Sequence, residues 1–326
     1  MADTTRGCRT NTTCAVVLAA GLAACSSASG ASQPGFDWGK PGDGGQSTAT
    51  MASTLHTESS QPTDSDAGEG VPPGADSGSP LGGDAATGPD CPPSAKLIYV
   101  TGVESESAPI GNDLYSFDPT TGSFKLIGAM SCLEGPTHMT VDRQGTAWVV
   151  ANGELYKAST ENASCARVTS FTPDPDRFPD FALSFVATDT SLYLLGTSGE
   201  LGEFNTTVGG PVLDVGTISI PASGDMTTGG DGTLYYLEQA ATQTLNELNP
   251  ANASIIHSWT TGKNSMNTQA LAYYGGLFYD FIGNAVFTYD TSTSTTKSIG
   301  TAPIYVTGAG QSTCVPSESV PPAMLK

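Results

Sequence analysis

The chain has 326 residues, of which 32 are Asp or Glu and only 12 are Lys or Arg, giving a formal net charge of −20. Just 13% of the residues are charged, against about 25% in an average soluble domain. This excess of acid excludes a nucleic-acid-binding protein, which needs clustered cations to neutralise phosphates. The 39 Gly and 22 Pro exclude a coiled coil or long-helix protein.

The first segment, residues 1–24, has the pattern of a signal peptide. Arg6 and Arg9 precede an apolar run over residues 14–24, which is shorter than the ~20 residues of a transmembrane helix and has the length of a signal-peptide core. The run ends in Leu-Ala-Ala-Cys25 and is followed by Ser26. This resembles the lipobox of bacterial lipoproteins.

The lipobox resemblance implies that Cys25 is lipidated and becomes the mature N-terminus, and that Ser26 directs the protein to the outer membrane. A lipid bilayer is therefore the first expected partner, reached through acyl chains such as palmitate that contribute about 0.8 kcal/mol per buried methylene. The alternative is an ordinary secretory signal cut nearby, with Cys25 incidental.

The second segment, residues 25–90, is predicted to be a disordered tether. Gly, Ser, Pro, Ala, Thr and Asp make up 52 of the 65 residues after Cys25, so there is too little apolar surface to offset the entropy of ordering the chain. The acids over residues 64–69 lack the full spacing of a calcium loop. We interpret them as part of the linker.

The third segment, residues 91–326, contains a repeat. An apolar residue followed by an aromatic recurs at intervals of 42 to 49 residues, ending at Tyr99, Trp148, Tyr193, Tyr235 and Phe278. Gly, Asn, Asp and Pro separate short β-branched or alternating runs, a pattern typical of strands joined by turns. In the second repeat we expect strands over residues 138–141, 146–150, 154–158 and 166–170.

Four short strands in 40 to 45 residues is the period of a β-propeller blade. The first repeat begins at residue 97 without a leading strand, and residues 304–310 at the chain's end supply one. We therefore predict an all-β fold, a five-bladed β-propeller of four-stranded antiparallel blades closed by the C-terminal strand. The alternatives are a β-sandwich, a less regular all-β domain or a six-bladed ring.

The cysteines support ring closure. Four remain after the leader and lipobox: Cys91, Cys132, Cys165 and Cys314. An even number in an exported domain implies disulfides, with three possible connectivities. We pair Cys132 with Cys165, on the outer strands of neighbouring blades, and Cys91 with Cys314 across the closure.

The central channel offers the candidate site. The first strands of the repeats place five residues near one mouth: His138, Ala182, Asp225, Ala270 and Tyr305. His138, Asp225 and Tyr305 are the polar candidates, and His138 beside Asp225 suggests an ion pair or a weak metal site. The alternative is that they are ordinary polar groups facing channel water. A glycosidase needs two carboxylates, and this ring supplies one.

Other motifs carry less chemistry. Asp174, Asp176 and Asp180 crowd one interblade loop, where calcium is conceivable but turn-forming Asp beside Pro is the simpler interpretation. Three Asn-x-Ser/Thr sequons begin at Asn162, Asn205 and Asn252, and the lipobox gives them no glycosylation role. We expect no metal, no cofactor and no catalytic residue.

Together these features resemble exported bacterial lipoproteins of unassigned function with β-propeller-type repeats. Sequence patterns common to propeller blades in general occur at Met139–Trp148 and Leu114–Pro119. They do not indicate a particular activity. We expect a monomeric, membrane-anchored binding or scaffold module for an unknown protein or glycan ligand, on the periplasmic or surface face of the outer membrane. The alternative is a propeller hydrolase of glycans or lactones with an atypical site.

Overall fold

The computed structural model describes residues 91–105, 111–186, 188–220, 223–265 and 269–325. The signal peptide, Cys25 and the tether predicted from the sequence lie outside the described residues. So does the acidic run over residues 64–69. A 3-10 turn, η2 (Pro93–Lys96), precedes the first strand.

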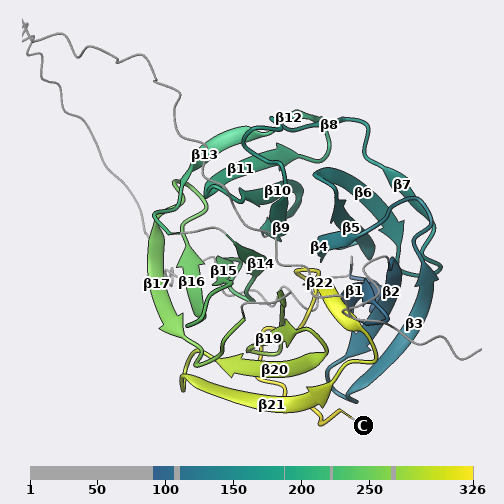
Figure 1. Ribbon diagram of the computed structural model, residues 1–326, viewed down its shortest axis with the longest axis vertical. Helices are drawn as coiled ribbons and strands as arrows, with labels where there is room; N and C mark the ends of the chain where they lie inside the picture. The colour runs from purple at the N-terminus through teal and green to yellow at the C-terminus, as the bar shows by residue number, and fades with distance from the viewer. Residues whose placement is uncertain (1–90, 106–110, 187, 221–222, 266–268, 326) are drawn as a thin grey trace, which may run out of the picture. The chain divides into compact units, whose positions relative to one another are not determined.

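The described residues form five four-stranded antiparallel sheets arranged as the blades of a ring (Figure 1), which confirms the predicted five-bladed propeller. From the centre outward, the strands of blade 1 are β22 (Tyr305–Gln311), β1 (Ile98–Val103), β2 (Asp113–Asp118) and β3 (Ser123–Ala129). Those of blade 2 are β4 (Pro136–Val141), β5 (Thr146–Ala151), β6 (Glu154–Ser159) and β7 (Cys165–Arg167). Those of blade 3 are β9 (Phe181–Val186), β10 (Thr188–Gly196), β11 (Glu200–Asn205) and β13 (Leu213–Thr217). Those of blade 4 are β14 (Gly224–Thr228), β15 (Leu234–Glu238), β16 (Thr244–Leu248) and β17 (Ile255–Thr260). Those of blade 5 are β18 (Gln269–Tyr274), β19 (Leu277–Ile282), β20 (Ala285–Asp290) and β21 (Thr295–Thr301).

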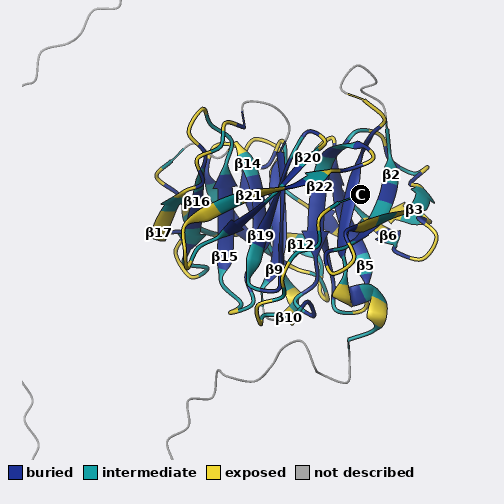
Figure 2. Ribbon diagram, turned by 90° about the horizontal axis from the view of Figure 1, so that it is seen from below, coloured by how far each residue is buried: buried dark blue, intermediate teal, exposed yellow. Residues whose placement is uncertain are grey.

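Burial falls from the inner strands to the outer ones, as Figure 2 shows. Every residue of β18 is buried, whereas β3 is mostly exposed. An inner strand has neighbouring blades on both faces and can be apolar throughout, while an outer strand keeps one face in water and alternates. The core lies between blades, where rings such as Phe117 and Phe281 pack edge to face across the junction of blades 1 and 5.

The C-terminal strand closes the ring. β22 pairs with β1 from Ile98 opposite Gln311 to Val103 opposite Tyr305, so the last strand of the chain completes the first blade and leaves no open sheet edge there. Figure 1 shows this junction as the yellow strand beside the blue ones. Gly310 makes the closure compact, because a Cβ there would lie 2.4 Å from the carbonyl oxygen of Met139 on the next inner strand.

The chain then continues along the outside of the closed ring. The Val320 amide donates to the Gly275 carbonyl (3.0 Å) and the Leu325 amide to the Ile299 carbonyl (2.8 Å). The apolar side chains of both residues pack against the core shared by blades 1, 4 and 5. We call residues 315–325 the C-terminal strap.

The structure contains both disulfides expected from the sequence. Cys91 is bonded to Cys314 and Cys132 to Cys165, with Cα–Cα distances of 5.8 Å in each. Cys314 follows β22 directly, so the first bond ties the beginning of the domain to its closing strand.

The outer strands differ most from the sequence expectation. The expected strand over residues 166–170 is β7, only Cys165–Arg167. The chain then forms a short strand, β8 (Phe171–Thr172), which pairs in parallel with β12 (Gly210–Pro211) of blade 3. Two residues per strand carry no detectable period, so the sequence offers no signal for this pair.

Candidate functional site

The five inner strands begin at one end of the channel, which we call the entry mouth, and finish at the far end. In each blade, the repeat aromatic on the second strand pairs with a residue of the inner strand. The residues shortly before these partners lie at one level just inside the entry mouth: His138, Ala182, Asp225, Leu271 and Gly308. The alignment of the chain's own repeats was therefore wrong by one residue in blade 5 and by three residues in blade 1. It gave Ala270 for Leu271 and Tyr305 for Gly308, because short strands contain no mark of register.

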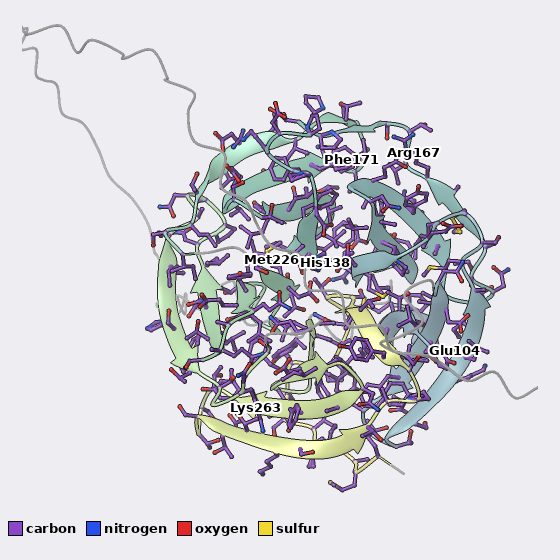
Figure 3. The ribbon with its side chains drawn as sticks, in the orientation of Figure 1. Glu104, His138, Arg167, Phe171, Met226 and Lys263 are labelled. Atoms are coloured by element: carbon purple, nitrogen blue, oxygen red, sulfur yellow. A yellow bond between two sulfur atoms is a disulfide. The ribbon has the colours of Figure 1, made fainter. Side chains whose placement is uncertain are left out.

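His138 and Asp225 form the predicted pair. The imidazole Nδ1 of His138 lies 2.9 Å from Oδ1 of Asp225, although the two residues belong to blades 2 and 4. Blade 3 contributes only the methyl group of Ala182 at this level, so the imidazole can reach across the channel. Figure 3 places His138 at the centre of the ring, beside Met226 of the strand that carries Asp225.

Asp225 is completely buried, and its two oxygens also accept hydrogen bonds from backbone amides. Oδ1 accepts from the Met226 amide (2.9 Å), and Oδ2 accepts from the Leu271 amide of blade 5 (2.7 Å). Inner strands have one edge without a partner strand, so their amides need such acceptors. The carboxylate therefore joins blades 2, 4 and 5 at the channel.

The pair favours a protonated His138. Burial lowers the pKa of its imidazole, but the hydrogen bond and charge of Asp225, with a further contribution from Asp180, raise that pKa above its ordinary value. The ring is 15% exposed, and Asp225 engages only Nδ1. Nε2–H is thus the donor that this pair leaves for a group at the entry mouth.

Gln311 forms a second polar layer nearer the far end. Its amide nitrogen donates to Thr227 Oγ1 (2.8 Å) and to the Thr228 carbonyl (3.0 Å), and its Oε1 accepts from the Tyr273 amide (3.0 Å). Gln311 is 4% exposed. The closing strand therefore fills the channel with a side chain that binds blades 4 and 5.

Asp280 is a buried carboxylate that sequence reasoning missed. It lies on the second strand of blade 5 opposite Leu271, is 3% exposed, and neither oxygen accepts a hydrogen bond from a described group within bonding geometry. Burial raises its pKa to about 7, outweighing the opposite effects of the nearby Gln243 amide and Lys263 ammonium, while Asp225 raises it further. The signal available was one charged residue in the apolar run Leu277–Ile282.

The amides around Asp280 form a network between blades 4 and 5. Gln243 donates to Gln269 Oε1 (3.1 Å), and Gln269 donates to the Leu237 carbonyl (2.6 Å). Thr261 donates to the Gln243 side chain. These groups fix the junction of the two blades at its entry end.

The other sequence candidates lie differently. The Tyr305 ring lies over Gly283, where a Cβ would approach it to 2.8 Å, at the turn between β19 and β20. Asp174 accepts the Asp176 amide within a turn (3.0 Å), and Asp180 accepts from Thr137 Oγ1 (3.1 Å) at the entry mouth. Within the described ranges, no three His, Cys, Asp or Glu side chains are grouped to hold a metal ion.

The polar groups near the entry mouth divide into buried and accessible ones. Asp225 and Asp280 are both buried, so neither oxygen pair is open to a substrate at the mouth. Among the described residues, the accessible groups there include the His138 imidazole, Asp180 and Thr137, all partly exposed. They combine donors and acceptors on a rigid ring.

No protein-family model and no curated protein matches the chain. Solved structures with a similar fold include a protein of unknown function from Bacteroides thetaiotaomicron, at 10% identity and a TM-score of 0.42, covering 61% of this chain and 58% of that one. A second is virginiamycin B lyase from Staphylococcus aureus, a catalytically inactive variant with quinupristin (12% identity, TM-score 0.38, 63% and 69% covered). A third is the WD40 domain of Neurospora crassa Pan2 (13% identity, TM-score 0.35, 67% and 69% covered).

The chain is a β-propeller. The likeness to these structures concerns the fold alone, and this chain spans little more than half the length of the first of them. Function has therefore to be argued from the site, because propellers host many unrelated activities.

Proposed function

We propose that this protein is an exported, membrane-anchored binding module whose propeller holds its ligand at the entry mouth, over His138. The observation that carries this proposal is the complete burial of Asp225, with each of its oxygens already hydrogen-bonded. An acid held in this way orients and charges the imidazole. The imidazole then offers Nε2–H to an acceptor such as a hydroxyl or carboxylate oxygen of a glycan or protein.

The hydrolase alternative gains no support from this geometry. Glycoside hydrolysis needs two carboxyl groups facing each other across the scissile bond. Of the described acids whose charges reach the pair, Asp225 and Asp280 are buried and Asp180 is partly open to the mouth. One accessible carboxylate beside an imidazolium suits recognition.

Two disulfides support export, because such bonds persist in oxidising compartments outside the cytoplasm. No helix within the described ranges is long and apolar enough to cross a membrane. We propose that anchoring comes from lipidation of Cys25, with residues 26–90 as the tether and the outer membrane as the destination.

The ligand proposal is tested on a glycan array with the full chain and two matched histidine variants. His138→Gln keeps a hydrogen-bonding group near Asp225 but removes the cationic donor, and we expect about a tenfold loss of signal on the glycans bound by the wild type. His257→Gln changes an exposed histidine on β17, paired with Glu247, and should leave the signal unchanged. Equal binding by all three proteins contradicts the site, and release of reducing sugar supports a hydrolase instead.

Anchoring is tested separately by growing cells with labelled palmitate. We expect label in the full chain and none after Cys25→Ser, while Cys14→Ser, which changes a thiol inside the apolar run, should retain it. Label that persists without Cys25 contradicts the lipidation proposal and leaves the mouth proposal untouched.

A further inference from the structure

A second pocket lies at the far end of the ring, between blades 4 and 5. Its volume is about 400 Å³, within the range of small-molecule sites. The walls are the rings of Tyr235, Tyr273 and Phe278, with Asp231 at the rim and Ser317 of the C-terminal strap opposite. Asp231 lies in the turn that follows β14, and Asp225 lies at the start of the same strand. The two sites therefore lie at opposite ends of this strand.

At the pocket, blade 4 departs from the turn used in blade 2. In both blades the first and second strands are joined by the same hydrogen-bonded turn, and the register makes Asp142 equivalent to Gly229 and Trp148 equivalent to Tyr235. The Asp142 side chain fills the turn of blade 2 and is 6% exposed. Gly229 has no side chain, and the carboxylate of the exposed Asp231 lies in that place instead, because a Cβ on Gly229 would meet Asp231 Oδ1 at 2.8 Å and the Tyr235 ring at 2.7 Å.

The walls of the pocket are fixed before any ligand arrives. Asp231 Oδ1 accepts the Thr233 amide (3.0 Å), and Oδ2 accepts the Tyr235 hydroxyl (3.2 Å). The Tyr273 hydroxyl donates to the Ser317 carbonyl (3.3 Å), which holds the strap against blade 5. Rigid walls reduce the entropy that a ligand must overcome on binding.

The Phe278 ring contacts both tyrosine rings. The centroid of Phe278 lies 4.6 Å from that of Tyr235 and 5.3 Å from that of Tyr273. Each ring carries partial negative charge on its face, which attracts a cation within about 6 Å of the centroid. Asp231 adds a full negative charge, and no Lys, Arg or His stands among the residues that line the pocket.

We propose that this pocket is a second binding site, specific for an organic ammonium group such as a quaternary or primary amine on a small molecule or side chain. Aromatic rings with one carboxylate and no balancing cation select positive charge over both neutral and anionic groups. The formal charge of −20 works in the same direction at long range. The proposal is independent of the entry mouth and goes beyond the function proposed above.

The test compares two probes of nearly equal shape on the full chain: choline and its neutral carbon analogue, 3,3-dimethylbutan-1-ol. We expect a saturation-transfer NMR titration to show choline binding at least fivefold more tightly than the analogue. Asp231→Asn keeps the acceptor of the turn and removes the charge, so it should weaken choline binding about fivefold and leave the analogue unchanged. Asp176→Asn, an exposed acid at the other side of the ring, is the matched control.

A second variant places a cation in the pocket. Thr291 lines the rim from the turn between β20 and β21, so Thr291→Arg should abolish choline binding, while Thr169→Arg on the exposed loop after β7 should not. Thermal melting checks that each variant is folded. Equal affinity for choline and the analogue, no detectable choline binding, or equal loss in Asp231→Asn and Asp176→Asn would each overturn the proposal.

Discussion

Asp280 is one residue that makes the stability of this fold depend on pH. Its carboxyl group is buried on the second strand of blade 5, and burial raises its pKa to about 7. The unfolded chain returns this group to a pKa of about 3.9. The folded state therefore binds the proton more tightly, and ionisation at higher pH works against folding.

We expect the domain to lose stability as the pH rises from about 4 to about 7, because over this range the unfolded chain has released the Asp280 proton while the folded chain still holds it. A shift of this size corresponds to roughly 4 kcal/mol at the upper end of the range. Asp280→Asn removes the ionisation, so it should raise the free energy of unfolding at pH 8 by roughly 1–3 kcal/mol, after the cost of a buried amide. Chemical denaturation at several pH values measures both effects.

The matched control is Asp176→Asn, which changes an exposed carboxyl group and should alter stability by less than about 0.5 kcal/mol. At about pH 3 Asp280 is neutral in both the folded and the unfolded chain, so Asp280→Asn should have little effect there. A variant with the same pH profile as the wild type would show that Asp280 is not the titrating group.

The His138–Asp225 pair gives a second residue-scale prediction. Removing either partner leaves the other charge buried and unpaired, so His138→Gln and Asp225→Asn should each cost about 3 kcal/mol or more. The double variant should cost less than the sum, with a coupling of about 2 kcal/mol. Because the pKa of His138 is raised, the contribution of the pair is present below pH 6.5 and is lost as the pH rises through the folded-state pKa. Urea unfolding of the four proteins at pH 6 measures the coupling, and additive single effects would contradict it.

At this scale the sequence predicts some of the site and misses the rest. His138 and Asp225 were predicted because each is a polar residue at the start of an inner strand. Asp280 was missed because a carboxylate beside the channel arises from the second strand of blade 5. Gln311 was missed because nothing local marks a residue that reaches across to two other blades.

At the scale of single elements, the turn between the first and second strands shows how a repeat is fixed. In blade 2, Asp142 accepts from the amides of Gln144 (3.1 Å) and Thr146 (2.7 Å) and from the indole of Trp148 (2.9 Å). One buried carboxylate thus holds the turn and orients the large ring behind it. In blade 4, the exposed Asp231 makes part of the equivalent set of hydrogen bonds.

This difference predicts unequal effects of the same substitution. Asp142→Ala removes three hydrogen bonds to a charged acceptor and leaves buried donors unsatisfied, so it should cost about 3 kcal/mol or more. Asp231→Ala removes two bonds at an exposed rim and should cost about 1 kcal/mol or less. Thermal melting of the two variants decides the point. Equal shifts in Tm would mean that blade 4 depends on its turn as blade 2 does.

The turns between third and fourth strands explain the three sequons. Asn162, Asn205 and Asn252 each accept the amide of the residue two positions later, at 2.9, 3.0 and 3.0 Å. A side chain that closes such a turn is favoured as Asn or Asp, with Ser or Thr nearby. The turn geometry accounts for the Asn-x-Ser/Thr pattern.

Short elements such as β7 and β8 were harder to predict from the sequence, because their pairing depends on contacts between blades.

On the scale of the whole molecule, ring closure was predictable because a strand was missing at one end of the repeat and spare at the other. The C-terminal strap was not, since residues 315–325 have no strand period and are placed by contacts with Gly275 and Ile299. The net charge of −20 also divides, with +1 in residues 1–24, −8 in residues 26–90 and −13 in residues 91–326. The acids of the domain lie mostly on turns and outer strands, where they keep an exported protein soluble.

Closure gives the last prediction, because two bonds of different span hold the ring. Cys91–Cys314 closes 223 residues and Cys132–Cys165 closes 33, so the chain-entropy model assigns them about 5 and about 4 kcal/mol. The longer bond also holds the start of the domain beside β22, the strand on which closure depends. We expect Cys91→Ser with Cys314→Ser to lower the free energy of unfolding more than Cys132→Ser with Cys165→Ser, measured by guanidinium unfolding of both double variants. A larger loss from the shorter bond would mean that β22 holds the ring without covalent help.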